Sequence, residues 1–420
     1  MMKQICVLFM LPLLASAAES RRGTPAAPAA VFEPEAHSLG KAKSPKFYAR
    51  RAHGLMMLNT VSAPGGGADL MFQSSSDLGD NFEEPMRVND TSGEVSDHGE
   101  NSPQLLTSPD ESTMYAVWNA RDPKNPAASV VRFASSGTMR PVWSPAITLN
   151  DDGKPVSHGF QSAAVGPDGT IYAAWLDGRD GRASTEGATG GTTSIYLTRS
   201  TDGGKTFSKN IRVATNVCPC CRVAFGFVSG KVLLAWRQVE AGDIRDIYFA
   251  SSADGGKSWE SGKPVFRDGW KIKGCPHVGP AMATLGDKVY VTWFSEGAED
   301  PAIYMAVSSD AGKTFSPRQK ISAGTTDPTH PQIAVGEDRI GITFQARDAK
   351  VQGGWGKMSV WYQEVRANGS LSPLTKAAEG KGNLTYPTVA LGLSGRVFLG
   401  WTETVEGLPK AMLLRGRIGK

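Results

Sequence analysis

Short apolar segments that end in an aromatic residue recur along the chain from about residue 47 onward. Turns rich in glycine and aspartate separate them, and no segment keeps a helical periodicity. The clearest copies are residues 115–118, 172–175, 233–236, 290–293, 341–344 and 398–401. Their terminal aromatic residues lie 57, 61, 57, 51 and 57 residues apart, and residues 55–61 lie one period upstream. The spacing indicates a repeated structural unit of short strands.

Each unit follows the same order of segments. A strand of small residues such as 281–284 leads through a Gly286-Asp287 turn into the aromatic-ended strand, and a polar loop leads to a third strand such as 302–307. Four short antiparallel strands in about 50 residues are typical of a β-propeller blade. We therefore predict an all-β propeller of four-stranded blades, six or seven in number, with seven units counted. Residues 389–415 offer only three strands, so we expect an N-terminal strand to complete that blade and close the ring.

A second repeated feature follows the third strand of several units. The segments are 200–207, 252–259 and 308–315, with a looser copy at 75–82. Each has the form Ser-x-Asp-x-Gly-x-x-aromatic, and its aspartates are Asp77, Asp202, Asp254 and Asp310. The carboxylate can accept backbone N–H groups across the turn, and glycine supplies the positive φ. We assign these motifs a structural role.

Four such motifs at blade spacing resemble the Asp-box, or BNR, repeats of sialidase-like β-propellers. The resemblance covers most of the chain after residue 47 and implies the fold. It also suggests exo-α-sialidase chemistry, in which arginines bind a carboxylate, a tyrosine attacks and an aspartate acts as acid and base. The matching candidates are Arg121, Arg179, Arg237, Arg347, Tyr386 and Asp97. The family's Phe/Tyr-Arg-Ile-Pro motif is missing, since the nearest stretch, residues 47–52, lacks Ile-Pro.

The N-terminal residues have the pattern of a secretory signal. A lysine precedes an apolar run too short to span a bilayer, and Ala15-Ser16-Ala17 fits a cleavage site. We predict a signal peptide at 1–17, a flexible Ala/Pro-rich leader at 18–46 and a single propeller domain at 47–420. The protein is then expected to be exported, periplasmic or extracellular, with no membrane span. A net charge of +4 without a basic run gives no indication of nucleic-acid binding.

Cysteine and histidine gather at one kind of position in the repeat. In a propeller, the residues before the first strand and after the second strand of every blade meet at one mouth of the central channel. Four cysteines and four of the six histidines stand just before a first strand: Cys218, Cys220, Cys221, Cys275, His98, His158, His277 and His330. The sequence therefore predicts a cluster of sulfur and imidazole groups at this mouth.

Three functions remain open for that mouth. Thiolates and imidazoles favour a soft metal such as copper or zinc, for metal handling or metal-dependent catalysis. Sialidase or related glycoside hydrolase activity is the first alternative, and non-catalytic binding of a protein or glycan is the second. Two disulfides would also account for four cysteines in an exported protein.

Overall fold

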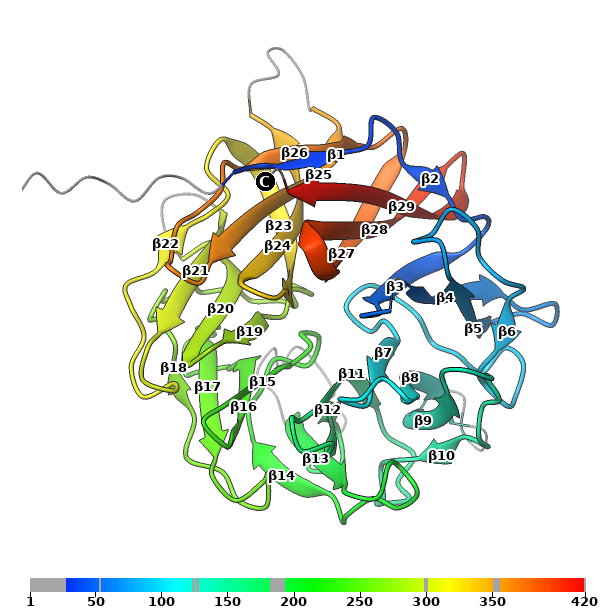
Figure 1. The fold of residues 1–420 in the computed structure, drawn as a ribbon. Coiled ribbons are helices and arrows are strands. Elements are labelled where there is room, and N and C mark those ends of the chain that lie inside the picture. The colour runs from blue at the N-terminus through cyan, green and yellow to red at the C-terminus, as the bar shows by residue number, and fades with distance from the viewer. Residues whose placement is uncertain are drawn as a thin grey trace, which may run out of the picture.

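The computed structural model describes residues 28–52, 54–122, 125, 128–181, 193–297, 301–349 and 356–418. These residues form seven antiparallel sheets arranged as blades around a central axis (Figure 1). Six blades have four strands, and the seventh has a short fifth strand beside its edge. In the described part of the chain, the 3-10 turn η1 (Leu393–Gly395) is the one helical element. The prediction of an all-β propeller is confirmed, and the number of blades is seven.

Each blade takes consecutive strands from the chain. Blade I contains β3 (Lys43–Ala49), β4 (Leu55–Ser62), β5 (Ala68–Ser75) and β6 (Met86–Arg87). Blade II contains β7 (Gln104–Thr107), β8 (Thr113–Arg121), β9 (Ser129–Gly137) and β10 (Ile147–Thr148). Blade III contains β11 (His158–Val165), β12 (Ile171–Asp177), β13 (Ser194–Ser200) and β14 (Ile211–Ala214). Blade IV contains β15 (Ala224–Val228), β16 (Lys231–Arg237), β17 (Ile247–Ser252) and β18 (Lys263–Pro264).

The remaining blades continue this order up to the C-terminal end. Blade V contains β19 (Ala281–Leu285), β20 (Lys288–Ser295), β21 (Ala302–Ser308) and β22 (Gln319–Lys320). Blade VI contains β23 (Thr325–Val335), β24 (Arg339–Asp348), β25 (Met358–Arg366) and β26 (Thr375–Glu379). Blade VII contains β27 (Asn383–Leu391), β28 (Arg396–Val405) and β29 (Leu408–Ile418), joined by β1 (Ala30–Phe32) and β2 (His37–Ser38).

The N-terminal strand closes the ring. β1 pairs antiparallel with β29, with Ala30 opposite Ile418 and Phe32 opposite Gly416, and β2 pairs further along the same strand. The blue and red ends of the chain lie side by side in Figure 1. Pairing here covers an edge that β29 would otherwise expose, and it confirms that an N-terminal strand completes the last blade.

The expected flexible leader is therefore wrong from Ala30 onward, because this stretch belongs to blades VII and I. Phe32 packs edge-on against the ring of Tyr362, with 5.5 Å between the centroids. The prolines that suggested a leader occupy places a sheet tolerates. Pro34 lies between β1 and β2, and Pro45 lies in an irregularity of β3. The predicted signal peptide lies outside the described residues.

The hydrophobic core lies between neighbouring blades. The aromatic residues that recur in the second strands are fully buried: Trp118, Trp175, Trp236, Trp293, Phe344 and Trp401. One core cluster joins Phe249 of blade IV to Trp293 and Tyr304 of blade V. Each blade thus stabilises the next one around the ring. Among the described residues, no helix is long and apolar enough to cross a membrane.

The four turns that carry the Ser-x-Asp-x-Gly motif share a hydrogen bond from the N–H of the fourth residue after the aspartate to its carboxylate. In the turn after β17, the Asp254 carboxylate accepts the N–H groups of Lys257 and Ser258 at 2.9 Å and the Ser258 hydroxyl at 2.6 Å. The aromatic residue that ends each motif packs on the preceding blade. Phe315, for example, lies against Phe249 with 5.2 Å between the ring centroids. The turns connect third and fourth strands and lie at the opposite end of the blades from the cysteine segments. Their role is structural.

Replacing Asp254 with alanine should lower the melting temperature by a few degrees at neutral pH, because two backbone donors lose their acceptor. Hydrogen bonds, first that from the Ser258 hydroxyl, hold the pKa of Asp254 well below its ordinary value of 3.8. A depressed folded-state pKa gives stability that is present above pH 3.8 and is lost as the pH falls further. The difference between wild type and D254A in thermal melts should therefore shrink below pH 3.8. The exposed Glu84→Ala is the matched control, and a pH-independent difference would contradict this account.

Candidate functional site

The first strand of every blade lies nearest the axis, and unusual backbone geometry marks where these strands begin. Figure 1 shows β3, β7, β11, β15, β19, β23 and β27 around the centre. Six non-glycine residues near these starts are left-handed: Ser44 (φ 51°), Phe160 (54°), His277 (52°), Asp327 (50°), His330 (55°) and Tyr386 (52°). Such backbone costs about 1–3 kcal/mol per residue and concentrates at functional sites. The mouth where the strands begin is therefore the place to look for function.

Three cysteine sulfurs form a buried cluster beside this mouth, which we call the sulfur cluster. The Sγ atoms of Cys218, Cys220 and Cys221 are separated by 3.6 Å (218 to 220), 3.9 Å (220 to 221) and 3.5 Å (218 to 221). Their residues are only 1–3% exposed. A disulfide needs about 2.05 Å between sulfurs, and all four cysteines of the described chain are free. The two-disulfide alternative is therefore not what the structure shows.

The local sequence explains how three sulfurs meet. Pro219 and Cys220 form a tight turn, for which the fixed φ of proline is suited. The N–H of Cys218 bonds to the carbonyl of Arg237 at the end of β16, at 2.9 Å. The turn then directs the chain back, which brings Cys221 beside Cys218 immediately before β15.

Two buried arginines place positive charge against the sulfur cluster. The Nη1 atom of Arg245 donates to the Sγ atom of Cys218 at 3.1 Å, and the Arg237 guanidinium lies nearby. Hydrogen bonds from the neighbouring thiols, first that of Cys220, hold the pKa of Cys218 far below its ordinary value, and Arg237 adds to the effect. Burial in turn raises the pKa of Cys221. Cys218 is thus the thiolate of the cluster.

Cys275 and His277, which we call the outer pair, approach the sulfur cluster from blade V. Their ligand atoms and the Sγ atom of Cys220 all lie within 4.8 Å of one another, and both residues are exposed. Phe160 packs against the buried cysteines. Its ring centroid lies 5.7 Å from that of His98 and 6.5 Å from that of His277. The cysteines of blades IV and V, which the sequence placed at one mouth, therefore lie together in the structure.

His158, in contrast, does not join the sulfur cluster. It is fully buried, its Nδ1 atom lies 2.7 Å from the Ser129 carbonyl, and its Nε2 atom lies 3.0 Å from Asp152. Asp177 lies 3.8 Å away on the same side. The expectation that His158 adjoins the cysteines is therefore wrong. The bulge between Gly159 and Ser162 turns the strand start, so His158 faces the interface of blades II and III.

A group of polar side chains that we call the axial polar cluster lies closest to the axis. Its members come from blades I, II, IV, VI and VII: Lys46, Asp97, Glu100, Arg222, His330 and Tyr386. The rings of His330 and Tyr386 are 4.4 Å apart. Both ring nitrogens of His330 are shielded from solvent and lack a hydrogen-bond partner among the described residues. Burial lowers the pKa of His330, so its imidazole is neutral.

One ion pair and several hydrogen bonds fix members of this cluster. Arg222 binds Glu100 and donates to the Pro331 carbonyl at 3.0 Å, while Glu100 also accepts the Gly279 N–H at 3.0 Å. Burial and then Arg222 lower the pKa of Lys46 to about 8. Burial raises the pKa of Asp97, which accepts hydrogen bonds from Thr60 and Ser44. Asp97 and Tyr386 were expected at the mouth, whereas Lys46, Glu100 and Arg222 were missed.

A positional signal for those three residues does exist in the sequence. Lys46 follows the left-handed Ser44 by two residues, Glu100 follows His98 by two, and Arg222 directly follows Cys221. They occupy the same place relative to a first strand as the cysteines and histidines. Applying the positional rule to every polar residue, rather than to metal-binding types alone, would have identified them.

Three of the four arginines expected to bind a carboxylate are engaged elsewhere, and the fourth is exposed. Arg237 donates to the carbonyls of Val278, Arg245 and Phe294 at 2.7–3.3 Å. Arg179 binds Asp177 and Asp151, both at 2.9 Å. Arg347 bonds to Asp327 at 3.2 Å, and Arg121 is exposed at the end of β8. These four arginines therefore do not form the clamp that the sialidase resemblance implied.

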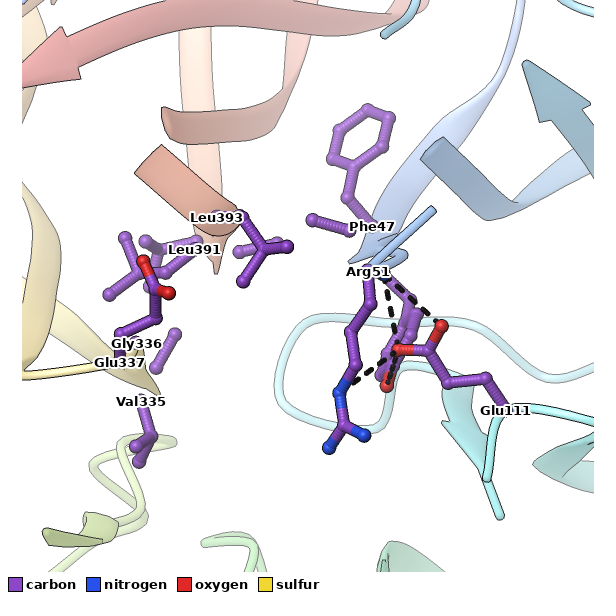
Figure 2. A pocket seen from close by; sticks show the side chains of 14 residues that line it. Phe47, Arg51, Glu111, Val335, Gly336, Glu337, Leu391 and Leu393 are labelled. Carbon is purple, nitrogen blue, oxygen red and sulfur yellow. Dashed lines mark hydrogen bonds and ion pairs between the residues drawn. The ribbon is translucent and has the colours of Figure 1, made fainter. Parts of the chain in front are cut away.

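A pocket of about 420 Å³ lies at the other end of the channel, where β3, β23 and β27 end. Figure 2 shows Leu391, Leu393 and Val335 opposite Phe47, with Arg51 directed to Glu111. Glu111 accepts the Arg51 N–H at 3.1 Å and the Tyr48 hydroxyl at 3.0 Å. The lining is mostly apolar, and its second carboxylate, Glu337, also accepts a hydrogen bond, from the Ser394 N–H at 3.2 Å. The cysteine end offers more chemistry, and we assign function there.

Comparison with solved structures agrees with the fold. An ulvan lyase of polysaccharide lyase family 25, bound to -[GlcA(1-4)Rha3S]-, aligns with a TM-score of 0.52 and 11% identity, over 92% of this chain and 95% of that one. A protein of unknown function from Dyadobacter fermentans aligns with a TM-score of 0.50 and 17% identity, over 92% of this chain and 100% of that one. The Hadza microbial sialidase Hz136 aligns with a TM-score of 0.49 and 15% identity, over 83% of this chain and 73% of that one. At these identities the likeness shows the fold alone.

No protein-family model matches the sequence, and comparison with curated proteins finds no match. The chemistry of the channel mouth must therefore be argued from its own residues.

Replacing Arg237 with methionine should lower the free energy of unfolding by about 3 kcal/mol, because three buried carbonyls lose their donor. Urea unfolding followed by tryptophan fluorescence measures the change. The exposed Arg121→Met should change it by less than about 0.5 kcal/mol. Equal effects of the two substitutions would contradict a structural role for Arg237.

Proposed function

We propose that the sulfur cluster binds a soft metal ion, Cu(I) or Zn(II), and that the protein handles this metal outside the cytoplasm. The observation that carries the proposal is the set of sulfur separations, 3.5–3.9 Å, among three buried cysteines. Exported localisation is part of the proposal and rests on the predicted signal peptide.

These separations fit sulfurs that share one ion. With a metal–sulfur bond of about 2.3 Å, the edge of a tetrahedral site is roughly 3.8 Å and that of a trigonal site roughly 4.0 Å. Sulfur donors select Cu(I) and Zn(II) over hard cations. Arg245, fixed against Cys218, supplies positive charge that stabilises thiolate in a buried position.

The burial of the sulfurs favours handling of a metal over catalysis with it. A catalytic metal site keeps one coordination position open to substrate. Cys218, Cys220 and Cys221 are 1–3% exposed, and Phe160 packs over them. A ligand set closed in this way suits retention of a metal ion.

Anaerobic reconstitution with Cu(I) and, separately, with Zn(II) tests the proposal. We expect the reduced protein to bind metal with a sulfur-to-metal charge-transfer band for Cu(I). Replacing Cys221 with serine should weaken binding about 100-fold, measured by competition with a chromophoric chelator, because a soft ligand in the sulfur cluster is lost.

The matched control is His37→Ala, which alters an exposed histidine at the outer edge of blade VII and should leave the affinity unchanged. If the exported protein holds no metal and its four cysteines resist reaction with a thiol reagent until reduced, the proposal is wrong.

A second function, processing of an acidic polysaccharide, is supported by the axial polar cluster. His330 offers a neutral imidazole whose ring nitrogens lack partners among the described residues, and the Tyr386 ring lies 4.4 Å away. A neutral base beside a hydroxyl is what abstraction of a proton next to a carboxylate requires. A structurally similar propeller is an ulvan lyase bound to a glucuronate-containing saccharide.

Incubation with ulvan and other uronate polysaccharides tests this second function. Cleavage by elimination leaves an unsaturated uronate, which absorbs in the ultraviolet. His330→Gln should reduce the rate at least about 100-fold, and Tyr386→Phe should also reduce it. The exposed His37→Gln is the control. Absence of product from all uronate substrates would remove the lyase hypothesis and leave the metal proposal untouched.

A further inference from the structure

We infer that the cysteine site has two metal positions that share Cys220, and that the exposed position loads the buried one. This inference rests on the proposed function and extends it. The inner position consists of Cys218, Cys220 and Cys221, and the outer position consists of Cys220, Cys275 and His277. In each group the three ligand atoms lie within 4.8 Å of one another. A thiolate can bridge two soft ions, so one sulfur can belong to both positions.

The two positions differ in exposure. The three cysteines of the inner position are almost inaccessible, whereas Cys275 and His277 are exposed. Phe160 packs over the buried sulfurs, with its ring 6.5 Å from that of His277. On the interior side, Arg245 is hydrogen bonded to Cys218. The outer pair therefore lies on the solvent side of the site and Arg245 on the interior side.

The backbone holds the outer pair in its place. His277 has φ 52°, a conformation that costs a bulky L-residue about 1–3 kcal/mol. The two following residues are held from blade IV and blade II. Val278 accepts from Arg237 at 3.0 Å and Gly279 donates to Glu100 at 3.0 Å. These two hydrogen bonds, to residues 278 and 279, hold the strained backbone in place. They thereby keep His277 at the edge of the sulfur cluster.

Transfer from the outer to the inner position is an exchange of ligands without redox change. Cys220 stays bound throughout. The bonds to Cys275 and His277 break while bonds to Cys218 and Cys221 form. The Cys221 thiol releases a proton, and the Cys275 thiolate takes one up. The oxidation state of the metal does not change, so no further reactant is required.

Charge sets the number of ions that the site can hold. Cysteine binds a metal as the thiolate, so four ligating cysteines carry −4, and the neighbouring Arg237 and Arg245 contribute +2, which leaves −2 to be balanced. Two Cu(I) ions or one Zn(II) ion supply +2. Uncompensated buried charge is strongly unfavourable. We therefore expect two Cu(I) per chain at saturation but one Zn(II).

Anaerobic titration with Cu(I), supplied as its bicinchoninate complex, tests the stoichiometry. Wild type should take up two Cu(I), and the double variant Cys275→Ser/His277→Ala should take up one. Zn(II), titrated against a chromophoric chelator, should saturate at one ion in the wild type. One Cu(I) in both proteins overturns the two-position arrangement, whereas no metal in either overturns the proposed function itself.

Stopped-flow loading tests the direction of transfer. In the double variant the inner position should fill about tenfold more slowly, because no exposed ligand captures the ion first. Adding Phe160→Ala to the double variant should restore much of the rate by opening a direct path to the sulfurs. His37→Ala should load at the wild-type rate. An unchanged rate in the double variant shows that the outer pair is not the route of access.

Discussion

The pairing of β1 with β29 is the interaction on which the channel mouth depends. It makes the seventh blade complete and joins the two ends of the chain across the ring. The sulfur cluster and outer pair come from blades IV and V, and the axial polar cluster comes from five blades. The separations within the axial polar cluster, which includes residues of blades VII and I, therefore depend on the closed ring. An open ring would still contain each blade but would not fix these distances.

Closure of the ring does not by itself set the direction of the side chains at the channel mouth. The backbone conformation at the starts of the first strands does so. Three left-handed residues are each held by a side chain of the preceding blade. The N–H of Ser44 bonds to Thr402 at 2.8 Å, that of Phe160 to Asn101 at 2.7 Å and that of Tyr386 to Gln345 at 2.7 Å. A polar residue of one blade thus stabilises strained backbone in the next. Coupling of this kind keeps a costly conformation in place.

Much of the fold could be predicted because it depends on spacing and on polar and apolar order. The buried tryptophans and the Ser-x-Asp-x-Gly turns repeat at blade length, so their spacing alone indicates the architecture. The same register placed Cys218 and Cys275 at equivalent points of adjacent blades. The N-terminal strand was only partly predicted, because a single strand of three residues carries no period and its prolines suggested a flexible segment.

The site was less predictable because the register gives a residue's position but not the direction of its side chain. His158 precedes a first strand as His277 does, but a bulge turns it into the interface between blades. Arg237 lies at the end of a second strand, where a ligand-binding arginine was expected, but its donors satisfy main-chain carbonyls of its own blade and of the next one. Such partners come from elsewhere in the fold and leave no local signal.

The fate of the arginines bears directly on the chemistry of the mouth. An arginine that binds a carboxylate ligand must keep N–H donors free. Arg237 instead donates to carbonyls, and Arg245 donates to the Cys218 sulfur. Fixed buried cations beside thiols favour the thiolate form before any ligand arrives. A binding site with its counter-charge already in place requires little reorganisation when the metal enters. In the proposed metal site, arginine therefore supplies counter-charge to sulfur instead of binding a carboxylate.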